Sequence, residues 1–148
     1  GGLNFGTTSV YATSTLLTLQ DKTFIIASTT GFNTGIGQGA LSRSFGVRNT
    51  ALGYNALLNG TSGSNNVAFG FQALAGSSTG AVSGSQNIAI GSFALASSSN
   101  GSNNVAIGMY ALSTSSSGSR NVVFITALSG VKYTDDPQDR LVLIEDLP

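Results

Sequence analysis

A nine-residue motif recurs along most of the chain, and this repeat constrains the fold more than any other feature of the sequence. Aligned on an asparagine, five copies read NTGIGQGAL, NTALGYNAL, NVAFGFQAL, NIAIGSFAL and NVAIGMYAL. They start at residues 33, 49, 66, 87 and 104, and a shortened copy, NVVFITAL, starts at residue 121. The spacings are 16, 17, 21, 17 and 17 residues, with an insertion of about four residues in the third interval. Units of this size cannot bury a core alone, so neighbouring units must stack on one another.

Each unit predicts a short strand. Counting the aligned asparagine as position zero, bulky side chains predominate at positions one and three, whereas positions two and four are almost always alanine or glycine. Alternation of this kind has the period of two that is typical of a strand. Alanine and leucine at positions seven and eight predict a second short strand after a bend. The remaining Ser, Gly and Asn residues predict exposed loops, and the Asn-Gly pairs at 59–60 and 100–101 predict tight turns with positive φ.

Stacked units of this kind predict an all-β fold, a β-solenoid or parallel β-roll of about six short coils over residues 32–130. No window shows a clean helical period, so helices are not expected. Six coils at a strand spacing of about 4.8 Å give a rod about 29 Å long. Two bulky ladders are expected to fill the interior, namely Ile36, Leu52, Phe69, Ile90 and Ile107, and Leu41, Leu57, Leu74, Leu95 and Leu112.

The small residues at positions two and four are expected to face away from that interior, and two explanations for them remain open. They make room for a bend, or they form a flat face that packs against neighbouring chains around a symmetry axis, since small residues allow close approach of another backbone. Under the second explanation, the residues that pack in a trimer are Ala51, Gly53, Ala68, Gly70, Ala89, Gly91, Ala106 and Gly108.

The sequence N-N-V-A-I-G-x-x-A-L, repeated at short intervals, resembles the repeat of trimeric autotransporter adhesin heads, the YadA-like left-handed β-roll. It is equally similar to repeats of bacteriophage tail fibres and related trimeric fibre proteins, and the resemblance covers residues 33–128. It implies a left-handed coil, a homotrimer and attachment to a cell-surface glycan or protein receptor. The implied location is extracellular, on a bacterial cell surface or a virion tail fibre. Coils of 16–17 residues are longer than those typical of the adhesin heads, which favours the fibre variant.

The two ends lie outside the strict repeat. Residues 1–31 contain SVYATSTLLTL and KTFIIAST, which predict two strands that form either a cap or a receptor-binding tip. A cap is expected on physical grounds, because an open solenoid end exposes unpaired strand edges. Residues 131–148 include RLVLIEDLP, which predicts one strand that closes the last coil or leads into a stalk.

Composition excludes several classes of function. Charged residues make up only 8% of the chain, the net charge is zero, and no charge occurs between Arg48 and Arg120, so no nucleic-acid partner is expected. No apolar stretch is long enough to cross a bilayer, so this segment is not expected to insert into a membrane. The absence of histidine and cysteine removes the commonest general base and the thiolate metal ligands. We therefore expect a non-enzyme with no catalytic residues and no cofactor.

Two local patterns nevertheless suggest ligands. Thr30-Gly31-x-x-x-Gly35-Ile36-Gly37 matches a dehydrogenase phosphate loop, but no Tyr-x-x-x-Lys pair, helix-forming segment or acidic residue about 20 positions later accompanies it. Its glycines belong to the first copy of the repeat. The cluster of Asp135, Asp136 and Asp139 could bind calcium, but it has no calcium-loop spacing, so a solvated turn is the preferred explanation and no metal site is predicted.

Positions five and six of the repeat vary most, and aromatic rings beside amides are what sugar binding requires. The candidate receptor-binding residues are Tyr54, Asn55, Phe71, Gln72, Phe93 and Tyr110. The alternative is that these aromatics pack between chains or over the edge of the roll. The insertion within residues 75–86 is a second candidate, because binding residues concentrate on loops. A purely structural spacer or assembly module of a fibre remains the other hypothesis for the whole chain.

Overall fold

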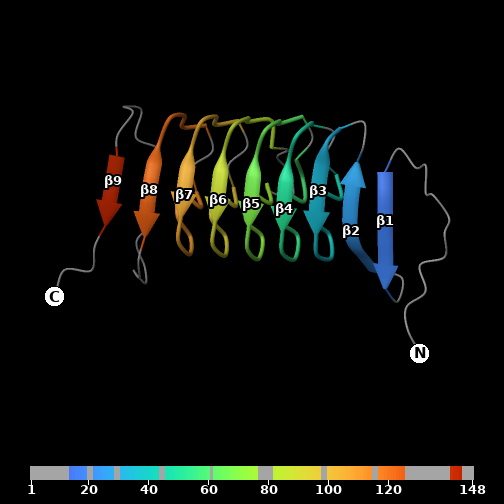
Figure 1. The fold of residues 1–148 in the computed structure, drawn as a ribbon. Helices are drawn as coiled ribbons and strands as arrows, with labels where there is room; N and C mark the ends of the chain where they lie inside the picture. The colour runs from blue at the N-terminus through green and yellow to red at the C-terminus, as the bar shows by residue number, and fades with distance from the viewer. Residues whose placement is uncertain are drawn as a thin grey trace.

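Within the part of the chain that the structure describes, nine strands form a single sheet in which their spatial order is their order along the chain (Figure 1). This computed structural model describes residues 14–19, 22–28, 31–43, 46–60, 62–76, 82–97, 100–114, 117–125 and 141–144. Those residues include no helix, and hence none long and apolar enough to cross a membrane. The strands are β1 (Ser14–Leu19), β2 (Lys22–Ser28), β3 (Asn33–Ile36), β4 (Thr50–Leu52), β5 (Val67–Phe69), β6 (Ile88–Ile90), β7 (Val105–Ile107), β8 (Val122–Ile125) and β9 (Leu141–Ile144).

Each of the six repeat units contributes one strand, from β3 to β8, and each of these strands pairs in parallel with the next. The register keeps equivalent repeat positions opposite one another, as in the pairing of Ala51 with Ala68 and of Ala89 with Ala106. The prediction of an all-β solenoid is therefore confirmed, and these strands define about five turns. At one end β1 and β2 form an antiparallel hairpin that adds to β3, and at the other β9 pairs in parallel with β8.

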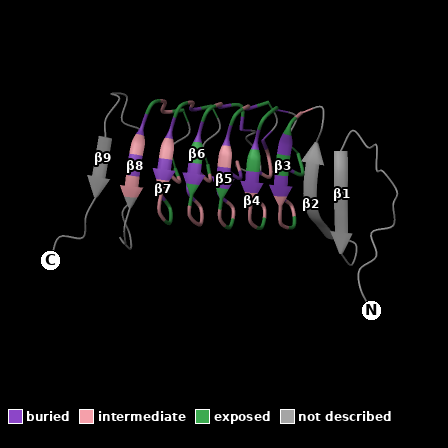
Figure 2. Cartoon of the chain, viewed as in Figure 1, coloured by how far each residue is buried: buried purple, intermediate pink, exposed green. Residues whose placement is uncertain are grey.

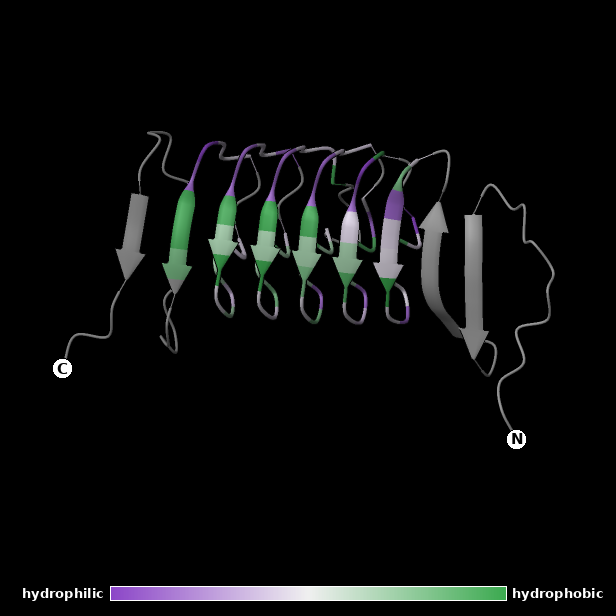
Figure 3. Cartoon of the chain, viewed as in Figure 1, coloured by the Kyte–Doolittle hydropathy of each residue, from purple (hydrophilic) through white to green (hydrophobic). Residues whose placement is uncertain are grey.

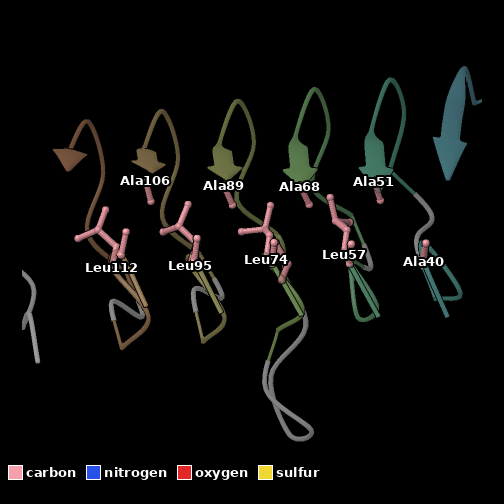
Figure 4. Packing of buried hydrophobic residues seen from close by; sticks show 14 of the residues in the cluster. Ala40, Ala51, Leu57, Ala68, Leu74, Ala89, Leu95, Ala106 and Leu112 are labelled. Atoms are coloured by element: carbon pink, nitrogen blue, oxygen red, sulfur yellow. The ribbon is translucent and has the colours of Figure 1, made fainter. Parts of the chain in front are cut away.

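Small side chains, not bulky ones, line the strand side of the interior. The four alanines at position two, Ala51, Ala68, Ala89 and Ala106, are completely buried. They point toward the leucines at position eight, which are buried as predicted (Figure 4). The bulky residues at position three lie outside, with Phe69 51% exposed and Ile90 39% exposed. The prediction that this bulky ladder fills the interior is wrong.

The narrow interior of the coil explains why the small residues, and not the bulky ones, face inward. Gly35 occupies position two of the first coil, and a Cβ placed there would lie 3.0 Å from Leu41 Cδ1 and 3.6 Å from the Ala40 Cβ. In the first five coils the space between the two walls therefore admits one methyl group opposite each leucine, and a larger side chain at position two there would overfill it. Period-two alternation separates two faces of a strand, but it does not say which face is inside.

In the first five coils the second wall is built of turns, so the second short strand predicted at positions seven and eight is not present there. The leucines there have left-handed backbones, with φ between 49° and 56°. Each leucine N–H from Leu41 to Leu95 still donates to the alanine carbonyl of the next coil, at 2.8–3.1 Å. Coil-to-coil bonding thus continues on this wall without strand geometry. Burial of the leucine side chain offsets the cost of a conformation that bulky residues seldom adopt.

The glycines at position four turn the chain away from the sheet. Gly53, Gly70, Gly91 and Gly108 have φ between 119° and 136°, a region that is unfavourable for any other residue. A Cβ on Gly91 would also lie 2.6 Å from the Gly108 oxygen in the next coil. These glycines therefore serve the bend, which is the first of the two explanations considered for them. The alanines assigned with them to trimer packing, Ala51, Ala68, Ala89 and Ala106, are buried in their own chain, so that assignment is wrong.

The aligned asparagines form a buried hydrogen-bonded ladder through the rod. Each asparagine from Asn33 to Asn104 accepts, through Oδ1, the backbone N–H of the next asparagine at 2.8–2.9 Å. Its Nδ2 donates to a glycine carbonyl of the next coil at 2.8–3.0 Å. Among the described residues no buried side-chain nitrogen or oxygen is left without a partner. The ladder fixes the register of the coils, because a slipped coil would leave buried amides unsatisfied.

Candidate functional site

Four aromatic rings contact one another in series along the corner that follows the position-four glycine of the second to fifth coils. This aromatic ladder consists of Tyr54, Phe71, Phe93 and Tyr110, with centroids 5.4, 5.3 and 5.0 Å apart in that order. Tyr54, Phe71 and Tyr110 are between 43% and 48% exposed, and Phe93 is half-buried. The structure therefore brings together all four aromatic residues proposed from the sequence as receptor contacts.

Backbone hydrogen bonds between coils hold this corner in register. The N–H at position six donates to the carbonyl at position five of the preceding coil, at 2.9 Å for both Gln72 to Tyr54 and Phe93 to Phe71. The rings occupy position five in the second and third coils and position six in the fourth and fifth. The change falls between Phe71 and Phe93, where the interplanar angle is 69°. The insertion in the repeat lies between the same two coils.

The two candidate amides are only partly exposed. The Asn55 side chain occupies the space that a Cβ of Gly39 would fill, so its Oδ1 packs against the preceding coil. In each parallel pair, Tyr54 with Phe71 at 11° and Phe93 with Tyr110 at 1°, one face of each ring is directed at its partner. A sugar thus meets fewer free ring faces here than four separate aromatics would offer. The ladder presents a continuous apolar stripe with phenol hydroxyls at its two ends.

A second apolar surface lies on the outside of the sheet. This outer sheet face comprises the side chains at positions one and three of β3 to β8, and sequence reasoning had placed its bulky members inside. Figure 3 shows hydrophobic strands from β5 to β8, and Figure 2 shows that parts of these strands are exposed or half-exposed. Its residues are Thr34, Ile36, Thr50, Leu52, Val67, Phe69, Ile88, Ile90, Val105, Ile107, Val122 and Phe124.

The residues of the outer sheet face and of the aromatic ladder are all uncharged, and the sequence has no charged residue from residue 49 to residue 119. The face extends about 29 Å along the rod and about 10 Å along each strand. Exposed apolar patches of this size mark interaction surfaces on soluble proteins. The outer sheet face is therefore a candidate interface in its own right.

Sequence reasoning missed a serine ladder that precedes the asparagines. The backbone N–H groups of Val47, Ser64, Ser85 and Ser102 each donate to the serine hydroxyl of the next coil at 3.0 Å. The signal was present, because Gly-Ser-x-Asn precedes the strand in the third to sixth copies. The inserted segment, considered above as a binding loop, also has a structural part, because Val82 is buried and its N–H donates to the Asn59 carbonyl at 2.9 Å.

Metal-ligating residues do not cluster in the part of the chain that the structure describes. No group of three or more His, Cys, Asp or Glu occurs there that could hold a metal ion. Asp135, Asp136 and Asp139 lie outside the described residues, so the preference for a solvated turn stays a prediction. Comparisons of the chain with protein-family models, with curated proteins and with solved structures return no match.

Proposed function

We propose that this chain is a non-enzymatic segment of a trimeric fibre or adhesin, located on a bacterial cell surface or a virion tail fibre. In this proposal the coil is left-handed, as the resemblance of the repeat implies, and three copies associate through their outer sheet faces. The assembled rod attaches to a cell-surface glycan or protein. The exposed apolar face is the observation that carries the proposal, because a rod that presents such a face requires a partner.

A second copy of the same chain is the partner that fits this face. Its strands are uncharged, so bringing two copies together creates no like-charge repulsion and buries no unpaired charge. Each copy carries the same ladders at the same spacing, so side chains of one face can interdigitate with those of another along the whole rod. The alanines at position two cannot form this interface, because they are already buried inside their own coil. The threefold symmetry itself rests on the resemblance.

A charge placed in the outer sheet face is expected to abolish association. Ile90→Asp introduces a carboxylate at an exposed strand position, where it would be buried unpaired in the assembly. We expect light scattering to give about three times the 14.9 kDa of one chain for the wild type and 14.9 kDa for Ile90→Asp. The control Ser97→Asp adds the same charge to an exposed turn residue and should keep the wild-type mass. A wild-type chain that stays monomeric at micromolar concentration would contradict the proposed assembly.

The aromatic ladder is the surface that we assign to receptor attachment. We expect the isolated chain to bind host cells or a component of a glycan array, and Phe71→Ala combined with Tyr110→Ala to weaken that binding tenfold or more, about 1.4 kcal/mol. The control Phe32→Ala removes another exposed aromatic side chain, outside the ladder. It should leave binding unchanged.

The alternative is a structural spacer that holds a separate tip away from the particle. The mutual stacking of the rings favours this alternative, because part of their surface is used within the chain. If an assembled, folded chain bound neither cells nor glycans, receptor attachment by this segment would be excluded. The spacer would then be the function that remains.

A further inference from the structure

Asn100 lies at an exposed bend that leads into the fifth coil and is followed by Gly101. Its Oδ1 accepts a hydrogen bond from the Ser83 hydroxyl of the preceding coil, at 2.5 Å. Asn59 and Gly60 have no positive φ, so the prediction of a positive-φ turn is wrong at 59–60, and Gly101 of the second pair has no positive φ either. The Asn-Gly sequences therefore need another interpretation than turn geometry.

We propose that Asn100 is a site of spontaneous deamidation, and that Ser83 promotes the reaction. The exposed bend opens so that solvent base removes the proton of the Gly101 backbone nitrogen. This nitrogen then attacks the Asn100 Cγ, forming a new C–N bond and a tetrahedral centre. Negative charge develops on Oδ1, where the Ser83 O–H already donates. The Cγ–Nδ2 bond then breaks, and the nitrogen leaves as ammonia with a proton from water. Water opens the resulting succinimide at either carbonyl, so the net change is amide plus water to aspartate or isoaspartate plus ammonia.

The other Asn-Gly pair provides an internal comparison. The backbone N–H of Asn59 donates to the Ala75 carbonyl at 3.0 Å, and its carbonyl accepts the Val82 N–H at 2.9 Å. Its Oδ1 accepts a long hydrogen bond from Arg43, at 3.4 Å. Closure of a succinimide requires the asparagine backbone to rotate, which at Asn59 would break two coil-to-coil hydrogen bonds. Deamidation at Asn59 is therefore expected to be slower.

Reaction at Asn100 would alter the asparagine ladder of the rod. Gly101 is buried, and its carbonyl accepts the Asn87 Nδ2 at 2.9 Å. Isoaspartate adds one atom to the backbone immediately before this glycine, and either product places a negative charge in the segment that otherwise has none. Material that has reacted should therefore show a lower denaturation midpoint than fresh material. This inference is independent of the proposed function.

The test is incubation of the folded chain at mildly alkaline pH, followed by peptide mass spectrometry and enzymatic methylation of isoaspartate. We expect Asn100 to convert faster than Asn59 in the folded chain, and the two to convert at similar rates in denaturant. Ser83→Ala should slow conversion at Asn100 roughly two- to tenfold, the effect of one lost hydrogen bond, without changing the rate at Asn59. Ser97→Ala, at an exposed serine of the same coil as Asn100, is the control.

Two outcomes would overturn the proposal. The first is that Asn59 converts as fast as Asn100 in the folded chain. The second is an unchanged rate at Asn100 in Ser83→Ala, once its denaturation midpoint shows that the variant is as well folded as the wild type.

Discussion

Replacing Asn87 with alanine is expected to lower the free energy of unfolding by about 2–6 kcal/mol. The Asn87 side chain donates to the Gly101 carbonyl at 2.9 Å and accepts the Asn104 N–H at 2.9 Å. Both backbone groups lose these bonds in the variant, and an unsatisfied buried group costs about 1–3 kcal/mol. Urea denaturation at a fixed protein concentration measures the difference, because association also contributes to stability.

Two further variants separate the lost hydrogen bonds from other effects. Asn87→Leu keeps most of the side-chain volume but none of the bonds, so we expect a loss close to that of Asn87→Ala. Asn100→Ala makes the same substitution at an exposed asparagine, and its cost should stay within about 0.5 kcal/mol. Equal effects of Asn87→Ala and Asn100→Ala would show that the buried ladder does not stabilise the rod.

Replacing Gly91 with alanine is expected to cost about 4 kcal/mol or more, or to prevent folding. At a φ of 124° an alanine is strained, and its Cβ would lie 2.6 Å from the Gly108 oxygen. Neither problem can be relieved by a side-chain movement, because the atom that is too close belongs to the backbone. The two coils would have to separate, which breaks the hydrogen bonds between them.

Gly35→Ala is the matched control for Gly91→Ala. Gly35 has no positive φ and occupies position two, where the next four coils carry alanine. The nearest atom to a new Cβ is Leu41 Cδ1 at 3.0 Å, the end of a flexible side chain that can shift slightly. We expect Gly35→Ala to stay within about 1 kcal/mol of the wild type, because lower unfolded-state entropy offsets the tighter contact. Thermal denaturation of both variants checks the contrast, and similar losses would contradict it.

The repeat was sufficient to predict the architecture, and the structure confirms it. Alternation at positions one to four predicts where the strands begin. The recurrence of the same motif every 16 to 21 residues implies that equivalent positions stack in register. The side of the strand that faces inward could not be predicted from the same signal. Alternation is symmetrical between the two faces, and the deciding quantity is the distance from position two to the opposite wall. That distance follows from the left-handed backbones of leucines such as Leu41 and Leu57, which a hydrophobic pattern does not reveal.

The candidate site was likewise predictable from the sequence only in part. Stacking in register was enough to predict that aromatic residues at positions five and six would lie near one another, and Tyr54, Phe71, Phe93 and Tyr110 do so. Their stacking angles depend on which of the two positions carries the ring, and the insertion changes that position midway. The asparagines are visible in the sequence as an aligned column, but their hydrogen bonding inside the rod was not predicted. An asparagine present in every copy immediately before the alternating positions is the signal for a buried hydrogen-bonded column.

Thiol accessibility on the two faces of β8 tests the central claim, that the bulky face is outside and the small face inside. The chain has no cysteine, and Val122 and Val123 are adjacent valines, half-buried on the outer sheet face and 2% exposed in the interior respectively. Each is changed to cysteine in the Ile90→Asp background, which keeps the outer sheet face free of other copies. We expect Val123→Cys to react with a thiol reagent at least about a hundredfold more slowly than Val122→Cys, because it becomes accessible only when the coil opens. Equal rates, or the opposite order, would contradict the arrangement of the two faces.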